Sequence, residues 1–159
     1  MLGLNLLDNV KDTIVSAGIG RISRRTVIDL EAEINAAEEY RRAMNIKASS
    51  IDVGVSTLSG GNQQKVVLAK WMFTQPSVAI LDEPTRGIDV GAKYEIYGLI
   101  HRLADEGKGV VMISSELPEL LGICDRIYTV FEGRITGELL AADATQESLM
   151  RLMTDTSAA

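Results

Sequence analysis

Two short segments of this chain carry residues suited to phosphate chemistry. The first reads Leu58-Ser59-Gly60-Gly61-Asn62-Gln63-Gln64-Lys65. A serine and two glycines at the start of a helix leave backbone N–H groups free for an anion, and glycine lets the anion approach without a Cβ clash. The second segment is an apolar run that ends in Asp82 and Glu83. Adjacent carboxylates suit a hydrated Mg²⁺ and a base that activates water.

Each segment also has a simpler explanation. Ser59 could be only the N-cap of an amphipathic helix, and Asp82 and Glu83 could be only solvated acids at a strand end. The apolar run before the two acids favours a functional interpretation, because it carries them into a sheet. The phosphate-gripping pattern G-x-x-x-x-G-K-[ST] is absent from the sequence. The sequence therefore predicts part of a nucleotide site, without the part that grips the nucleotide.

Composition limits the class of protein. The chain has 159 residues, 46% of them hydrophobic and 24% charged, which are values of one globular domain. The net charge of −6 argues against nucleic acid as the main partner. Cys124 is the only cysteine, so we expect a reducing compartment. The sequence shows no secretory leader and no apolar run of about 20 residues. We expect a cytoplasmic protein that reaches a membrane only by docking to a partner.

The first half of the chain predicts helices around a short extended segment. A helix is expected from Thr26 to Arg42, and Ile51 to Val55 is expected to be extended. Ser59 is expected to cap the next helix, which stops before Pro76. The positions expected to form the buried face of the first helix are Val27, Leu30, Ile34, Ala37 and Tyr40.

After Pro76 strands alternate with helices. Strands buried on both faces are predicted at Val78–Leu81 and Val110–Ile113, and a hairpin is predicted from Ile127–Phe131 and Arg134–Leu140 around Glu132-Gly133. The helices are expected at Val90–Asp105, Pro118–Cys124 and Thr145–Leu152. This order predicts an α/β fold, mostly parallel with an antiparallel edge hairpin. We expect a helical subdomain over residues 1–75 and a strand-containing part over residues 76–159.

In this order and at this distance, the two segments resemble the signature and Walker B motifs of ABC-type ATPases. Two further stretches of sequence narrow the resemblance to one group of these ATPases. They are Pro84-Thr85-Arg86-Gly87-Ile88-Asp89-Val90-Gly91-Ala92-Lys93 and Ser114-Ser115-Glu116-Leu117-Pro118-Glu119. They are similar to the C-terminal nucleotide-binding domain of tandem ATPases that serve monosaccharide importers of the ribose, galactose and xylose type. The resemblance implies a partial P-loop NTPase sheet, of the RecA-like ABC ATPase kind, with a helical signature subdomain.

The resemblance also implies a role for each candidate residue. Ser59, Gly60, Gly61 and Gln64 would face an ATP bound by a partner, Asp82 would hold Mg²⁺ through water, Glu83 would polarise the attacking water, and Asp89 would belong to the D-loop. Ser115 stands where the family has its switch histidine. A serine offers one hydroxyl hydrogen bond and no imidazole, so slow hydrolysis is expected. His101 lies within a predicted helix and is expected at the surface.

The implied cofactors are ATP and Mg²⁺. The implied partners are an ATPase domain or chain that carries a phosphate loop and the membrane permease of a sugar importer, at the inner face of the membrane. The chain alone is expected to be inactive. Two alternatives stay open: a non-catalytic regulatory or scaffold remnant, and an ATPase head of the chromosome-maintenance type. The negative charge and the lack of heptads before Leu58 disfavour the second.

Overall fold

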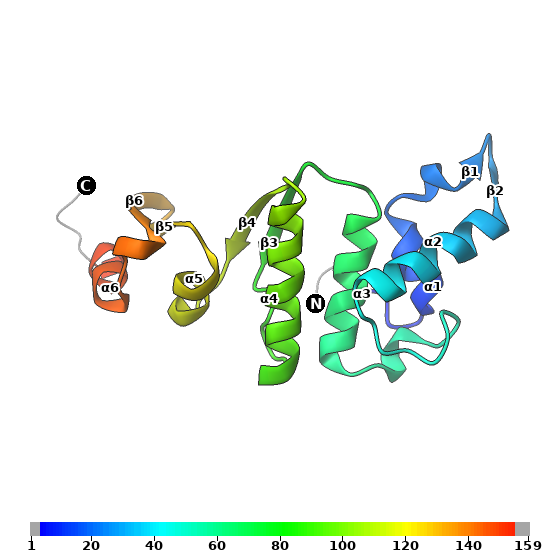
Figure 1. The fold of residues 1–159 in the computed structure, drawn as a ribbon, viewed down its shortest axis with the longest axis horizontal. Coiled ribbons are helices and arrows are strands. Elements are labelled where there is room, and N and C mark those ends of the chain that lie inside the picture. The colour runs from blue at the N-terminus through cyan, green and yellow to red at the C-terminus, as the bar shows by residue number, and fades with distance from the viewer. Residues whose placement is uncertain (1–3, 155–159) are drawn as a thin grey trace. The chain divides into compact units, whose positions relative to one another are not determined.

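The structure is a computed structural model that describes residues 4–154, and its elements are labelled in Figure 1. These residues form two units. The first unit contains residues 4–79 and 85–109, and the second contains residues 80–84 and 110–154. The boundary therefore passes through two strands, so each unit is described by itself. The division predicted between residues 75 and 76 stays a prediction.

The first unit is mainly helical. Its elements are α1 (Val10–Ser16), the 3-10 turn η1 (Ile19–Arg21), β1 (Ser23–Arg24), β2 (Val27–Ile28), α2 (Leu30–Ala43), η2 (Val55–Thr57), α3 (Gly60–Met72) and α4 (Val90–Asp105). Helix α1 packs against α2 and α3, and α4 lies beside α3 (Figure 1). Val10, Ile14, Val55, Val66 and Ile96 are fully buried and form the core of this unit. Their burial fixes α3, the helix that begins with Gly60 and Gly61.

Two strands cross the boundary between the units. Strand β3 (Val78–Asp82) pairs with β4 (Gly109–Ile113). At one end the Gly109 N–H donates to the Ser77 oxygen, and at the other the Glu83 N–H donates to the Ile113 oxygen. Both strands thus start at one edge and end at the other, so they are parallel, and they place Asp82 at the end of β3 and Ser115 two residues after the end of β4.

The rest of the second unit is a hairpin with two helices. Its elements are α5 (Leu117–Ile123), β5 (Arg126–Phe131), β6 (Arg134–Leu140), η3 (Ala141–Asp143) and α6 (Gln146–Thr154). Strands β5 and β6 pair antiparallel, and Glu132 and Gly133 turn the chain with φ of 47° and 76°. Leu149 of α6 is fully buried. The predicted α/β fold with a parallel pair and an antiparallel hairpin is confirmed. Across residues 4–154 the structure contains no helix long and apolar enough to span a membrane.

The helix predicted from Thr26 starts later and buries another face. Asp29 is its N-cap, accepting a hydrogen bond from the Ala32 N–H at 3.1 Å, and Val27 belongs to β2. Leu30 is 67% exposed, whereas Glu33 is buried. The reason is a tertiary ion pair, since Lys11 of α1 contacts Glu33 with Nζ 3.3 Å from Oε2. Of the predicted face, Ala37 is buried and Tyr40 is half-buried, so the spacing of apolar residues gave the buried face only in part.

The two strands predicted to be buried on both faces are covered on one face only. In β3, Ala79 and Leu81 are buried but Ile80 is 69% exposed. In β4, Ile113 is 50% exposed. Side chains alternate along a strand, so covering one face leaves every second residue open. The segment predicted to be extended, Ile51 to Val55, is a turn and a 3-10 turn whose backbone bonds to Asp8, Val10 and Lys11.

Candidate functional site

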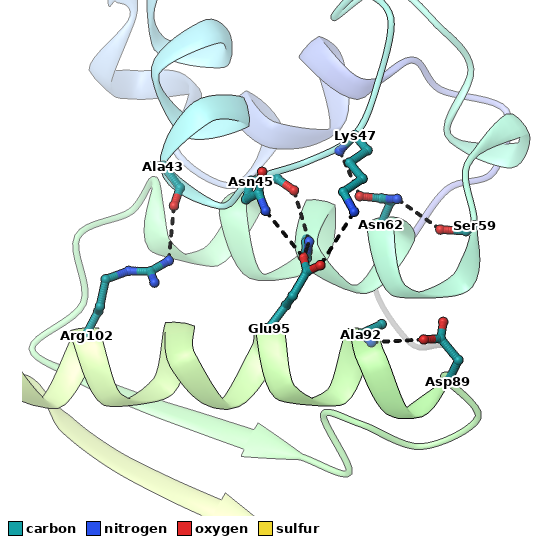
Figure 2. A network of polar contacts seen from close by, with 10 residues as sticks. Ala43, Asn45, Lys47, Ser59, Asn62, Asp89, Ala92, Glu95 and Arg102 are labelled. Atoms are coloured by element: carbon teal, nitrogen blue, oxygen red, sulfur yellow. Dashed lines mark hydrogen bonds and ion pairs between the residues drawn. The ribbon is translucent and has the colours of Figure 1, made fainter.

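Helix α3 presents an open N-terminus at the first predicted segment. Ser59 holds the N-cap position with φ of −62° and ψ of 155°, and the first helical bond runs from the Gln63 N–H to the Ser59 oxygen. The Ser59 side chain caps no backbone N–H and instead accepts a hydrogen bond from Asn62 Nδ2 at 2.9 Å (Figure 2). Ser59 and Gly60 are both exposed. The first-turn N–H groups and the Ser59 hydroxyl are thus placed to meet an anion.

The two glycines bring α3 close to the segment that precedes and starts α4. A Cβ on Gly60 would lie 3.8 Å from Ile88 Cγ2. A Cβ on Gly61 would lie 2.6 Å from Ala92 Cβ, a distance that atoms do not tolerate. Gly61 is buried, so its packing against Ala92 is a role that the sequence did not reveal. Its role toward a phosphate stays a prediction.

Asp89 is the N-cap of α4. Its carboxylate accepts a hydrogen bond from the Ala92 N–H at 3.0 Å (Figure 2). Gly87, with φ of 75°, allows the turn that delivers the chain to this cap. Asp89 therefore fixes where α4 begins, next to Ala92, which is the neighbour of Gly61. The helix spans Val90–Asp105, the range predicted from the sequence, and His101 is exposed on it as expected.

The polar residues that follow the glycines make different contacts. Gln63 Nε2 donates to the oxygens of Val55 and Leu58, at 3.2 and 3.1 Å, and so holds the turn that enters α3. Gln64 lies on α3 and is half-buried, and its contact with nucleotide stays a prediction. Asn62 was not among the predicted site residues, yet it touches the Ser59 hydroxyl. Only its position within the helix's first turn could have indicated this.

In the second unit, Glu83 is held by the loop that follows β4. The Ser115 N–H donates to Glu83 Oε1 at 2.9 Å. Glu83 itself has φ of 47°, a left-handed backbone that non-glycine residues seldom adopt and that concentrates at functional sites. Its N–H bonds to the Ile113 oxygen at 2.8 Å, which keeps this conformation tied to β4. The structure thus brings Glu83 and Ser115 together.

The loop that contains Ser115 is itself anchored. Ser114 Oγ donates to Glu119 Oε2 at 2.9 Å, and the Glu116 N–H donates to Ser114 Oγ at 3.0 Å. Glu119 is 6% exposed, so this anchor is buried in the first turn of α5. Ser115 lies between the anchored residues with its side chain exposed. Its N–H is therefore fixed while its side chain is free to change.

Asp82 ends β3 and is exposed. Residues 4–154 contain no group of three or more His, Cys, Asp or Glu side chains able to hold a metal by themselves. Mg²⁺ at phosphates needs only one or two carboxylates, because phosphate oxygens and water complete its shell. A single open carboxylate at this strand end fits that arrangement, with Glu83 next in the chain.

The predicted site residues fall into two groups. Ser59, Gly60, Gly61, Gln64 and Asp89 belong to the first unit, and Asp82, Glu83 and Ser115 belong to the second.

An ion pair that the sequence did not reveal lies next to the first group. Lys65 is buried, and its ammonium contacts Glu95 of α4. That hydrogen bond holds the pKa of Glu95 below its ordinary value, against the opposing effect of burial.

Comparison with known proteins gives one family match. The ABC transporter family matches residues 5–86, just over half of the chain, a range that includes Ser59 to Lys65, Asp82 and Glu83. Solved structures with the same fold include an ABC transporter in an inward-facing conformation, with a TM-score of 0.82 and 15% identity over 96% of this chain and 60% of that one. A dimeric ATP-binding cassette, MJ0796, bound to ADP and Pi has a TM-score of 0.73 and 22% identity over 87% of this chain and 59% of that one. At these identities the likeness shows the fold alone.

Curated relatives carry closer sequences. The chain is 58% identical to the L-arabinose transport ATP-binding protein AraG of Geobacillus stearothermophilus, over 98% of this chain and 30% of the relative. It is 52% identical to the xylose import ATP-binding protein XylG of Geobacillus kaustophilus, over 93% of this chain and 29% of the relative. It is 45% identical to the ribose import ATP-binding protein RbsA of Bacillus cereus, over 96% of this chain and 31% of the relative. The chain thus spans about 30% of the length of these relatives.

Proposed function

Since this chain belongs to the ABC transporter family, we propose that it supplies the signature, Walker B and D-loop segments of the ATPase of a monosaccharide importer. The observation that carries the proposal is the contact of α3 with the start of α4. Gly60 lies beside Ile88, and Gly61 lies against Ala92. Asp89, which lies between Ile88 and Ala92 in the chain, caps α4. Two segments that would meet the same nucleotide therefore adjoin in one unit.

The first unit would complete a site whose main grip on ATP comes from an ATPase domain or chain with a phosphate loop. The Ser59 hydroxyl and the N–H groups of Gly60 and Gly61 would donate to the γ-phosphate, at the positive end of a helix of 13 residues. Gln64 lies one turn further along, and we assign it a supporting contact. Asp89 would orient the D-loop toward the same nucleotide.

The second unit would serve a nucleotide gripped next to β3. Asp82 would hold Mg²⁺ through water, and the ion would neutralise charge on the phosphates. Glu83 would take the proton of the attacking water. The Ser115 N–H orients the carboxylate for this task, because it occupies Oε1 and leaves Oε2 for water. With no imidazole at residue 115, hydrolysis at this site would be slow.

The partners of the assembly would be the phosphate-loop domain and a membrane permease, at the cytoplasmic face. The sugar-import names of the relatives support this assignment. A second candidate is a regulatory or scaffold role without turnover. Ser115 favours that candidate, because the side chain at this position cannot act as the imidazole would.

A chimera separates the two candidates. In it, this chain replaces the matching segment of the L-arabinose ATP-binding protein of Geobacillus stearothermophilus, which is 58% identical there. Ser59→Asp and Ser59→Asn are both good N-caps and differ by one charge. If Ser59 meets a phosphate, Ser59→Asp should lower ATP hydrolysis by about tenfold or more relative to Ser59→Asn. Equal rates for the two variants would contradict the signature assignment. A chimera without any turnover would favour the scaffold role.

A further inference from the structure

A buried lysine lies one turn beyond the signature glycines. The Lys65 side chain is 3% exposed, and its Nζ donates to the Asn45 oxygen at 2.9 Å and contacts Glu95 Oε2. A buried ammonium without partners would be very costly, so these contacts fix where α3 sits. Lys65 plays no part in the function proposed above, and its burial calls for an explanation.

Glu95 joins three elements. Its Oε2 also accepts from Asn45 Nδ2 at 3.4 Å, and its Oε1 lies 3.6 Å from Lys47 Nζ (Figure 2). Asn45 follows α2 with a left-handed φ of 48°, which asparagine tolerates better than most residues. Its carbonyl therefore points to Lys65 while its side chain reaches Glu95. One carboxylate of α4 thus fixes both α3 and residues 45–47.

Residues 45–47 in turn hold the first turn of α3. The Lys47 N–H donates to Asn62 Oδ1 at 2.8 Å, and Asn62 Nδ2 donates to Ser59 Oγ at 2.9 Å. The Asn62 amide is committed at both ends, so its hydrogen bond determines the direction of the Ser59 hydroxyl. The chain of contacts from Glu95 therefore ends on the group proposed to meet a phosphate.

The same helix is fixed at its own start. Asp89 caps α4 through the Ala92 N–H at 3.0 Å, and Ala92 fills the space left by Gly61. Further along α4, Arg102 Nη2 donates to the Ala43 oxygen at 3.3 Å, at the end of α2 (Figure 2). Helix α4 is thereby held to α2 and α3 at three places. Among these contacts Glu95 forms ion pairs, with Lys65 and Lys47, and it is the one nearest to Asn62 along the contacts.

We propose that Glu95 is a positioning residue that fixes Ser59 relative to the Asp89-capped start of α4, acting through Lys65 and residues 45–47. It touches no nucleotide. The expected effect on hydrolysis rests on the proposed function. The effect of Glu95 on the position of Ser59 can be tested on this chain alone. It assigns a task to Lys65, Glu95 and Asn62 that explains why a lysine is buried beside a carboxylate of α4.

The main variant replaces the pair by apolar residues. Removing Glu95 alone would leave the buried Lys65 ammonium without its ion pair, whereas Lys65→Met with Glu95→Leu removes both charges and should keep the fold. We expect the amide resonances of Ser59 to Asn62 to shift in this chain, and ATP hydrolysis of the chimera to fall about tenfold. The matched control is Glu38→Gln, which breaks the ion pairs of Glu38 with Arg41 and Arg42 on α2. It should leave the same resonances and the rate in place.

Asn62 gives a second test that leaves the ion pair intact, and it decides the matter if the double variant does not fold. Asn62→Leu removes both amide contacts, and Asn62→Gln keeps an amide. We expect Asn62→Leu to lower the rate about tenfold by reducing kcat more than it raises KM, and Asn62→Gln to recover most of the loss. A rate within about twofold of the parent for Asn62→Leu, with unshifted Ser59 resonances, would overturn the proposal, and so would the same result for the folded double variant.

The proposed function and the positioning role of Glu95 can be contradicted separately. If Ser59→Asp and Ser59→Asn hydrolyse ATP equally, the proposed function fails, and the resonances of Ser59 to Asn62 in the chain alone still decide the link to Glu95. If those two variants differ but the double variant matches the parent in rate and spectrum, the proposed function stands and the positioning role of Glu95 fails.

Discussion

The Ser115 N–H donates to Glu83 Oε1 at 2.9 Å, so the backbone of one predicted site residue orients the carboxylate of another. The contact depends on no atom of the Ser115 side chain. Ser114 and Glu119 anchor the loop on the far side, through a hydrogen bond of 2.9 Å. The side chain at residue 115 can therefore be exchanged while Glu83 stays in place, which makes this position suited to a gain-of-function test.

Ser115→His should raise the rate of ATP hydrolysis in the chimera by about tenfold or more, because an imidazole can hold water and γ-phosphate in line. Glu83→Gln in the same background should cancel the gain, since the histidine then has no base to assist. Single-turnover hydrolysis with Mg-ATP is the measurement. The hydrolysis measured must be that of the nucleotide site that contains Asp82 and Glu83, at the end of β3.

The matched control for this gain is Glu116→His, which places an imidazole one residue further along. It should bring no gain, because the side chain leaves the loop in another direction. If Glu116→His accelerates hydrolysis as much as Ser115→His, the effect is one of charge and not of position. If the parent already hydrolyses ATP as fast as Ser115→His, the serine does not slow hydrolysis and the prediction is wrong.

Gly61→Ala should destabilise the chain, by about 1–3 kcal/mol, because the added Cβ would lie 2.6 Å from Ala92 Cβ. Adding Ala92→Gly removes the clash and should restore most of the loss, less about 1 kcal/mol for a glycine inside a helix. The free energies of unfolding of the parent, both single variants and the double variant form a cycle that measures this contact.

Gly98→Ala is the control for that cycle. It lies in the same helix as Ala92, and its added Cβ would have Arg102 Nη1 as its nearest neighbour, at 3.9 Å. It should stabilise the chain by up to about 1 kcal/mol, the gain of alanine over glycine in a helix. A Gly61→Ala variant as stable as Gly98→Ala would contradict the close packing of α3 on α4.

Local signals allowed the prediction of elements, and contacts between distant residues escaped it. Helix α4 has the predicted range Val90–Asp105, and Gly107, just after it, is a local signal for a helix end. The buried face of α2 was predicted only in part, because the ion pair of Glu33 with Lys11, 22 residues away, buries a charged position. Lys65 and Glu95 are 30 residues apart, so no spacing rule connects them. The hold on Glu83 is made by a backbone N–H, which no side-chain pattern can reveal.

The chain by itself should bind Mg-ATP only weakly, with a Kd above about 0.1 mM. It lacks the loop of N–H groups and the lysine that grip the β- and γ-phosphates in this class of site. Titration calorimetry on the chain is the test. A micromolar Kd, about −8 kcal/mol, would show a complete site and contradict the half-site.

Glu95 should make the stability of the chain sensitive to acid. Its pKa is lowered from the ordinary 4.5, chiefly by the hydrogen bond from Lys65, so its charged form is favoured in the folded chain. The stabilisation is complete above 4.5 and is lost as the pH falls through the lower folded pKa. In Glu95→Gln the Lys65 charge has no carboxylate partner at any pH, so this variant should be less stable than the parent at neutral pH and approach it as the pH falls through the lowered pKa of Glu95. Urea unfolding of both proteins across this range is the measurement. A stability difference that stays constant from neutral to acid would show that the Glu95 carboxylate carries no favourable charge interaction with Lys65.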